Sequence, residues 1–215
     1  MERILIEFAS YLAYTPRPTN QDQRLSKNIT LTLKEDEFLS KPQISISEFL
    51  VRELVKNMSS MPFLDFFQSK PTLVPTPSSS LTKPGTLWVP ARIANAMVKN
   101  GLGSSVVGSL VRVKALPKSA TSAPDDRPTA KDHYESMATQ KHMKELEDIV
   151  LIDDVITRGA TLIGAANRLA ESYPKARIRA FAMIRTISSA AEFISIQNPV
   201  RGTIRLVGDQ TRRVP

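Results

Sequence analysis

The 215-residue sequence contains no cysteine and only two histidines, His133 and His142. Without cysteine the chain can form no disulfide, bind no metal through thiolates and use no cysteine nucleophile. Two histidines also argue against a histidine-rich metal site. We therefore expect a fold stabilised by a hydrophobic core, and the length is sufficient for one large domain or one domain with an appendage.

Long apolar runs are also missing. No run approaches the roughly 18 residues that a bilayer-spanning helix requires. The first residues, MERILIEF, place Glu2 and Glu7 among apolar residues and lack the small-residue cleavage site of a secretory signal. We therefore expect a cytoplasmic protein with no membrane partner.

Acidic residues are too few to balance the basic ones, which gives a formal net charge of +8. Residues 1–70 hold nine Lys/Arg and nine Asp/Glu, whereas residues 71–215 hold 20 Lys/Arg and 12 Asp/Glu. The second part therefore suits an anionic partner, either nucleic acid or a phosphorylated small molecule, although a solvated basic surface is the alternative. Aromatic residues that would stack on bases are scattered there, which disfavours nucleic acid.

Residues 1–70 predict a mainly helical N-terminal extension without a catalytic pattern. The apolar spacing predicts a helix over 2–14, and the alternation in 29–33 predicts a short strand. Ser45 followed by Glu48 predicts a capping box that opens another helix. An aromatic cluster then follows, which we interpret as core packing: Phe63, Phe66 and Phe67.

From residue 71 onward, predicted strands alternate with predicted helices. The strands are expected at 72–74, 105–113, 149–152 and 178–184, and the helices at 90–101 and 162–173. Strand–helix–strand units at this spacing imply parallel pairing with right-handed crossovers. The predicted fold is α/β: a parallel sheet flanked by helices in residues 71–215, with residues 1–70 as an extension or hood.

The segment from Ile149 to Leu162, IVLIDDVITRGATL, combines an apolar strand, two acids and a short loop that opens a helix. Parallel sheets bind ligands at the carboxyl ends of their strands, so Asp153 and Asp154 are expected where a ligand is held. Adjacent carboxylates accept hydrogen bonds from vicinal hydroxyls and can also hold Mg²⁺. The alternative is a strand-ending cap followed by an ordinary helix start.

The loop after the acids has the features of an anion site: Thr157, Arg158, Gly159, Ala160 and Thr161. Backbone N–H groups and the helix dipole favour an anion at a helix N-terminus. Gly159 lets the backbone approach a phosphate closely. The threonine hydroxyls add further donors.

This segment resembles the phosphoribosyl-pyrophosphate (PRPP) signature of type I phosphoribosyltransferases, most closely their ComF-like branch, over roughly residues 71–186. The resemblance implies a transferase that binds PRPP with Mg²⁺, passes the phosphoribosyl group to a small-molecule acceptor and releases pyrophosphate. It implies that Asp153 and Asp154 contact the ribose hydroxyls and the metal, and that residues 157–161 bind the 5′-phosphate. Members that act on 6-oxopurines usually carry aspartate where Thr157 stands, which argues against that substrate class. Arginine at the position of Arg158 also resembles the amidophosphoribosyltransferase version of the loop.

Two further segments resemble parts of the same family. The turn VPTPSS resembles a pyrophosphate loop, which would be formed by Thr76, Pro77, Ser78 and Ser79; a simple proline-rich turn is the alternative. Arg112 precedes a polar stretch, residues 114–131, that fits the flexible catalytic lid of these enzymes. The lid residues expected to neutralise pyrophosphate are Lys114, Lys118, Arg127 and Lys131, of which we favour Arg127, together with Arg112, as catalytic. The alternative for each of them is a charged side chain that only solvates the loop.

Several assignments stay open at this level. His133 is a general base or, as we favour, an anchor of the lid or a surface residue. The basic tail, with Arg201, Arg205, Arg212 and Arg213, is expected to be solvated or to touch phosphates, nucleic acid or a partner subunit. The chain lacks the cysteine zinc module of many ComF relatives. A non-catalytic PRPP sensor is the alternative to an enzyme, the acceptor is undefined, and a homodimer is compatible with the resemblance.

Overall fold

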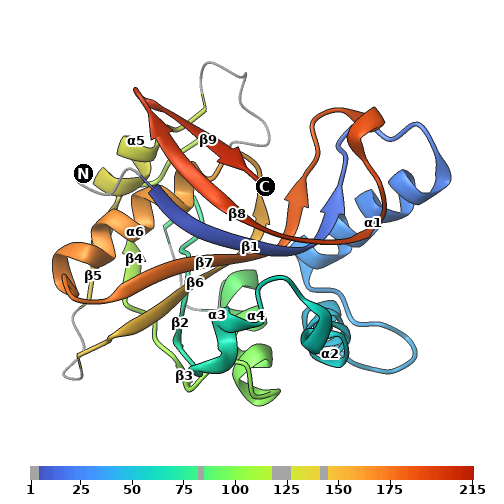
Figure 1. The fold of residues 1–215 in the computed structure, drawn as a ribbon, viewed down its shortest axis with the longest axis horizontal. Helices are drawn as coiled ribbons and strands as arrows, with labels where there is room; N and C mark the ends of the chain where they lie inside the picture. The colour runs from blue at the N-terminus through green and yellow to red at the C-terminus, as the bar shows by residue number, and fades with distance from the viewer. Residues whose placement is uncertain (1–4, 82–84, 118–126, 141–144) are drawn as a thin grey trace.

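The computed structural model describes residues 5–81, 85–117, 127–140 and 145–215. A seven-stranded sheet with the order β3-β2-β6-β7-β1-β8-β9 runs through the described residues (Figure 1). Its strands are β1 (Leu5–Tyr14), β2 (Thr72–Pro75), β3 (Ser105–Val106), β6 (Asp148–Ile156), β7 (Arg177–Thr186), β8 (Gln197–Val207) and β9 (Gln210–Val214). The strands from β3 to β1 in this order are parallel to one another. β8 pairs antiparallel with β1, and β9 pairs antiparallel with β8.

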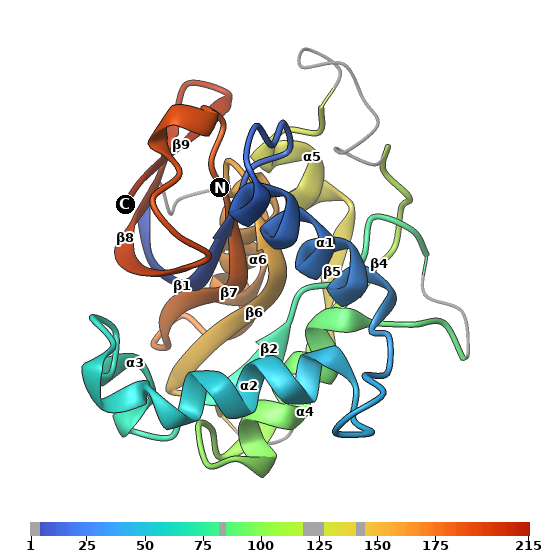
Figure 2. The same cartoon turned by 90° about the vertical axis from the view of Figure 1, so that its right-hand side faces the viewer.

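Helices cover both faces of the sheet, as the views in Figures 1 and 2 show. One face carries α1 (Gln21–Glu35), α2 (Ile46–Lys56), α3 (Asp65–Gln68) and α4 (Val89–Lys99), with the short turn η1 (Met58–Ser60). The other face carries α6 (Ala160–Ser172) with α5 (Ala130–Glu135) packed on it. A separate antiparallel pair, β4 (Leu110–Arg112) and β5 (Met137–Thr139), flanks α5, and η3 (Ala190–Glu192) precedes β8. The predicted α/β class, a mostly parallel sheet flanked by helices, is confirmed.

The core is divided by the sheet into two apolar layers. Ile152 and Phe181 belong to the layer under α2 and α4, whereas Leu151 and Ala180 belong to the layer under α6. The aromatic cluster expected in the core lies in the first layer, because the rings of Phe63 and Phe67 lie 5.7 and 5.6 Å from the ring of Phe181.

The helix expected over residues 2–14 is wrong, because residues 5–14 form β1. β1 pairs with β7 on one side and β8 on the other. Residues 8–13 are all buried, so both faces of this strand are apolar and the hydrophobic pattern loses its period of two. The boundary near residue 70 therefore separates segments that share one sheet, and the role of residues 1–70 as a hood stays a prediction.

The strand expected at 29–33 is also wrong, because these residues lie in α1. Asn20 caps this helix by accepting a hydrogen bond from the N–H of Gln23. The buried face of α1 consists of Gln23, Ser26, Thr30 and Leu33, which have helical spacing but are mostly polar. Thr30 satisfies its hydroxyl by donating to Ser26 O at 2.8 Å, so the buried face does not show as an apolar stripe.

The remaining elements follow the sequence pattern with local differences. β2, β6, β7, α4 and α6 lie where they were predicted, and Ser45 caps α2 by accepting from the N–H of Glu48. The strand expected at 105–113 is instead two short strands, β3 and β4, which belong to different sheets. None of the helices within the described ranges is both long and apolar enough to span a bilayer.

Candidate active site

The candidate site begins where β2 and β6 end side by side at the carboxyl edge of the parallel sheet. Pro75 is paired with Ile152, and the N–H of Thr76 donates to the carbonyl of Ile152 at 2.9 Å. The Thr76 hydroxyl donates to Oδ1 of Asp153, also at 2.9 Å. The structure thus brings the first residue of the predicted pyrophosphate loop into contact with the first of the two acids.

The two acids lie inside β6, because the strand continues to Ile156. Asp153 Oδ1 accepts from the N–H of Asp154 at 3.1 Å, and Asp154 Oδ1 accepts from the N–H of Val155 at 2.8 Å. Burial, followed by the charge of Asp154, raises the pKa of Asp153 well above its usual range. A ligand that brings hydroxyl hydrogens or a cation to this pair would relieve that repulsion.

The donor set at these acids fits a magnesium ion. Mg²⁺ prefers carboxylate oxygens and is usually held by one or two carboxylates together with water and substrate phosphates. Among the described residues, neither Asp153 nor Asp154 forms an ion pair within 4 Å. The described residues include no cluster of three or more His, Asp or Glu side chains that could hold a metal ion.

The predicted phosphate loop connects β6 to α6. Thr157, Arg158 and Gly159 form the loop, and Ala160 and Thr161 are the first two residues of the helix. Gly159 has φ +89°, and a Cβ built there would lie 2.7 Å from Ile204 Cγ2. The backbone conformation and the space both exclude a side chain at Gly159. The loop is therefore closely packed against β8, with its N–H groups at the positive end of the α6 dipole.

Side chains of the loop are held by neighbouring elements. The Thr157 hydroxyl lies 3.1 Å from the hydroxyl of Thr186, at the end of β7. Nη1 of Arg158 donates to Oε1 of Gln210 at 3.0 Å. These contacts place the loop at the ends of β6 and β7, where a parallel sheet binds ligands.

Arg213 also supports this loop, whereas the basic pattern of the tail predicted no specific contact for it. Its Nη1 donates to Ile156 O at 3.1 Å and its Nη2 to Thr186 O at 2.7 Å. Burial, followed by repulsion from Arg185, lowers the pKa of Arg213 to about 10. Arg201, in contrast, forms ion pairs with Glu7 and Asp65.

Arg112 lies under the predicted pyrophosphate loop and is only 5% exposed. Its Nε donates to Ser78 O at 2.8 Å, its Nη2 to Pro77 O at 3.2 Å and its Nη1 to Ser136 Oγ at 2.5 Å. Burial lowers the pKa of Arg112 to about 10, against the opposing effect of Asp153, so it remains protonated at neutral pH.

The contacts of Arg112 fix the direction of the loop's amide groups. In a trans peptide the C=O and N–H of one unit point in opposite directions. Since the carbonyls of Pro77 and Ser78 point at Arg112, the N–H groups of Ser78 and Ser79 point away from it. Neither N–H forms a hydrogen bond with a described residue. Two adjacent N–H donors that point the same way are able to bind an anion.

Trp88 is a further supporting residue to which the sequence assigned no role. Its Nε1 donates to the carbonyl of Thr76 at 2.7 Å, which fixes the loop where it leaves β2. A single tryptophan just before the proline of a predicted helix is a weak signal, because the contact joins residues from separate elements.

The lid residues are only partly described. Residues 118–126, with Lys118, lie outside the described residues. Lys114 is exposed. Nζ of Lys131 lies 3.9 Å from Oε1 of Glu135, and both residues belong to α5. Arg127 is half-buried, and its Nε is buried without a hydrogen-bond partner among the described residues. The catalytic roles expected for Arg127 and the lysines therefore stay predictions.

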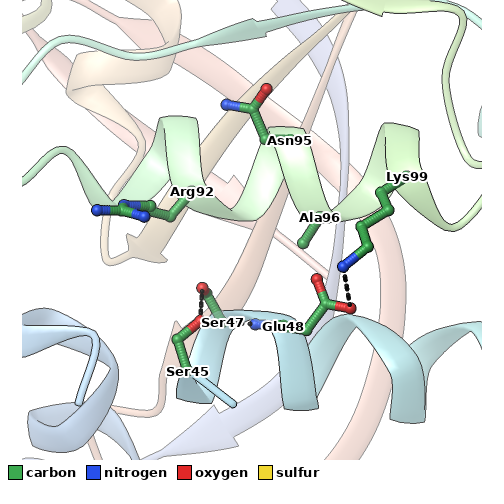
Figure 3. Close-up of a pocket in the computed structure, with 7 residues that line it drawn as sticks. All are labelled: Ser45, Ser47, Glu48, Arg92, Asn95, Ala96 and Lys99. Carbon is green, nitrogen blue, oxygen red and sulfur yellow. Dashed lines mark hydrogen bonds and ion pairs between the residues drawn. The ribbon is translucent and has the colours of Figure 1, made fainter. Parts of the chain in front are cut away.

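One pocket lies apart from the predicted site residues, between α2 and α4 (Figure 3). Its volume is about 190 Å³ and it is lined by Ser45, Ser47, Glu48, Arg92, Asn95, Ala96 and Lys99. Lys99 and Glu48 form an ion pair at 3.4 Å across it. Its charged groups thus largely neutralise each other.

The fold and the site define an α/β protein with a polar, charge-rich site at the carboxyl edge of a mostly parallel sheet. No family model and no curated protein matches the chain. The solved structures similar to it include a purine phosphoribosyltransferase from Pyrococcus horikoshii Ot3 and a hypoxanthine phosphoribosyltransferase from Staphylococcus aureus. The first has 12% identity and TM-score 0.35 over 69% of this chain and 91% of that chain. The second has 14% identity and TM-score 0.32 over 69% of this chain and 70% of that chain.

Proposed function

We propose that the protein is a phosphoribosyltransferase that binds PRPP with Mg²⁺ and transfers its phosphoribosyl group to a small-molecule acceptor. The single observation that carries this proposal is that the loops after β2 and β6, which we assign to anion binding, converge on one pair of carboxylates. Thr76 joins the loop after β2 to Asp153, and the loop after β6 begins three residues beyond Asp154. PRPP has a phosphate, two vicinal hydroxyls and a pyrophosphate in the same order.

The three parts of the site would divide the ligand between them. The N–H groups at the start of α6 and the threonine hydroxyls would bind the 5′-phosphate, with Gly159 supplying the positive φ with which the loop enters the helix. Asp153 and Asp154 would accept hydrogen bonds from the ribose hydroxyls. The free N–H groups of Ser78 and Ser79 would bind the pyrophosphate.

Asp153 and Asp154 would also hold Mg²⁺, which supplies positive charge to the pyrophosphate oxygens when bound. The reaction forms a bond between the acceptor and ribose C1′ and breaks the bond from C1′ to pyrophosphate. The residues of this chain bind and orient the two ends of PRPP and stabilise the charge that develops on pyrophosphate. Arg112 would act by shaping the pyrophosphate loop, because its donors are engaged by carbonyl and hydroxyl oxygens of the protein.

The acceptor is the undefined part of this proposal. Thr157 stands where aspartate is expected for 6-oxopurine substrates, and its hydroxyl is engaged with Thr186. We therefore propose an acceptor outside that class. The ComF-like assignment, the hood formed by residues 1–70 and the homodimer stay predictions that rest on the resemblance.

A pyrophosphate-release assay separates an enzyme from a sensor. Purified protein is incubated with PRPP, Mg²⁺ and a panel of bases and amines, and released pyrophosphate is measured beside an Asp153→Asn/Asp154→Asn variant. Acceptor-dependent release that the variant lacks supports the transferase. PRPP binding without release for any acceptor indicates the non-catalytic PRPP sensor, and no binding at all contradicts both functions.

A further inference from the structure

His133 lies against the phosphate loop, and the mechanism above gives it no role. Its side chain is buried, and Nε2 is 3.4 Å from the hydroxyl of Thr161. Nδ1 is buried and has no hydrogen-bond partner in the described part of the chain. Burial, followed by the charge of Arg112, lowers the pKa of His133 to about 4, so the ring is neutral at physiological pH.

A neutral imidazole carries one N–H, and its position decides what Thr161 can do. If Nδ1 carries the proton, a buried N–H is left without an acceptor, and Nε2 accepts the hydroxyl hydrogen of Thr161. If Nε2 carries the proton, it donates to Thr161 Oγ1, and only a lone pair is unpartnered at Nδ1. Orphaned buried N–H groups are rarer than under-used acceptors, which favours the second arrangement. In that arrangement the Thr161 hydroxyl is free to donate to an anion.

The packing of α5 on α6 fixes the ring in this position. A Cβ built on Gly164 would lie 2.7 Å from His133 Cβ and 2.8 Å from Ala130 O, so the two helices are in backbone contact. Arg168 of α6 also covers the ring of Tyr134, at 3.9 Å from its centroid, and donates to its carbonyl. His133 therefore has little freedom to turn away from Thr161.

The backbone of His133 is held separately from its ring. Its carbonyl accepts from the Ser136 hydroxyl at 3.0 Å, and that hydroxyl accepts from Nη1 of Arg112. Replacing the His133 side chain leaves these bonds in place. The side chain acts toward the phosphate loop, whereas the backbone supports the residue that shapes the pyrophosphate loop.

From this geometry we infer that His133 is a positioning residue for 5′-phosphate binding: its Nε2–H donates to Thr161 Oγ1 and directs the Thr161 hydroxyl to the phosphate. The inference rests on the proposed function, because it assumes that the loop at residues 157–161 binds a phosphate. It assigns no proton transfer to His133, since among the described residues the ring forms no hydrogen bond with the acids or with the pyrophosphate loop.

Calorimetry with three probes tests the inference: PRPP with Mg²⁺, ribose 5-phosphate alone, and pyrophosphate with Mg²⁺. His133→Phe removes the donor and is expected to weaken ribose 5-phosphate binding about tenfold, while pyrophosphate affinity is unchanged. His133→Gln, which keeps an N–H near the Nε2 position, is expected to restore most of the lost affinity. The double variant His133→Phe/Thr161→Val should bind no more weakly than Thr161→Val. Tyr134→Phe, on the same helix, is the matched control and should bind like the unmutated protein.

The results distinguish a failure of the inference about His133 from a failure of the proposed function. If the unmutated protein binds no PRPP, the proposed function fails and the inference fails with it. If it binds PRPP but His133→Phe binds ribose 5-phosphate equally well, only the inference is overturned. An equal loss of ribose 5-phosphate and pyrophosphate affinity would also overturn it, because a general support of the fold would then explain the effect.

Discussion

The residues around the candidate site hold charges that their surroundings disfavour. Burial raises the pKa of Asp153, and it lowers the pKa values of Arg112 and Arg213 to about 10. Arg112 donates to carbonyls of the predicted pyrophosphate loop, and Arg213 donates to the carbonyls that end β6 and β7, beside the predicted phosphate loop. Perturbed groups of this kind gather at functional sites, where a ligand compensates for their unfavourable charge.

Asp153→Asn should stabilise the unliganded protein and weaken PRPP binding at least about tenfold. A carboxyl whose folded pKa is raised stabilises the fold below its unfolded pKa, and that stability is lost as pH rises through the folded pKa. Asn cannot ionise, and its side-chain oxygen still accepts from Thr76. Thermal unfolding between pH 4 and 8 should therefore give a higher Tm for the variant, with the largest difference at high pH. A lower Tm for Asp153→Asn at pH 8 would contradict the claim that the charged form of Asp153 destabilises the fold.

Arg112→Lys should destabilise the fold by about 2 kcal/mol, because the compact ammonium of lysine lacks the planar fork with which the guanidinium reaches both loop carbonyls and the Ser136 hydroxyl. Urea unfolding measures this change, and calorimetry should show a parallel loss of pyrophosphate affinity. Arg52→Lys, on the exposed surface of α2, is the matched control and should change stability by less than about 0.5 kcal/mol. Unchanged pyrophosphate affinity in Arg112→Lys would show that the loop holds its shape without this residue.

At the scale of elements, the hydrophobic pattern predicted helices and strands correctly where only one face is buried or where an apolar run is bounded by turn residues. The apolar run before Asp153 and the stripe from Leu162 to Leu169 predicted β6 and α6. β1 could not be predicted in this way, because both of its faces are buried and its apolar residues fit a helix as well as a strand. The prediction missed α1 for the opposite reason. The buried face of this helix consists largely of Gln23, Ser26 and Thr30, which supply no apolar pattern.

The close approach of α5 and α6 is tested by Gly164→Ala. The added methyl would meet the backbone of α5, so we expect a loss of about 1–3 kcal/mol from the free energy of unfolding. Gly108→Ala is the control, because a Cβ there first meets the Trp88 ring at 4.0 Å, which is an ordinary contact. Equal stability of the two variants in urea unfolding would contradict the packing of α5 on α6.

At the scale of the whole molecule, the site depends on contacts that no local pattern reveals. The sequence predicted Asp153, Asp154 and the loop after them, because these residues are consecutive and their chemistry is recognisable. It assigned no specific contacts to Trp88 or Arg213, which reach the site from the residue before α4 and from β9. The roles of these residues can be recognised only in the folded structure, because the fold brings β2, β6, β7 and β9 together at the site.

The position of β1 inside the sheet gives a prediction for the whole fold. Deletion of residues 1–14 would expose the edges of β7 and β8 and remove a strand in which residues 8–13 are all buried. We expect the truncated chain to lose its cooperative thermal transition, as followed by circular dichroism. A cooperative transition within a few degrees of that of the full chain would mean that the first 14 residues are a detachable appendage.

The central claim is that the two acids and the two loops form a cradle for PRPP, and calorimetric titration with PRPP and Mg²⁺ tests it most directly. We expect saturable one-to-one binding by the unmutated protein and at least a tenfold loss, or about 1.4 kcal/mol, in Asp153→Asn/Asp154→Asn. Glu145→Gln/Glu147→Gln, which neutralises two exposed acids just before the start of β6, should bind like the unmutated protein. Absence of binding by the unmutated protein, or equal loss in both double variants, would contradict the claim.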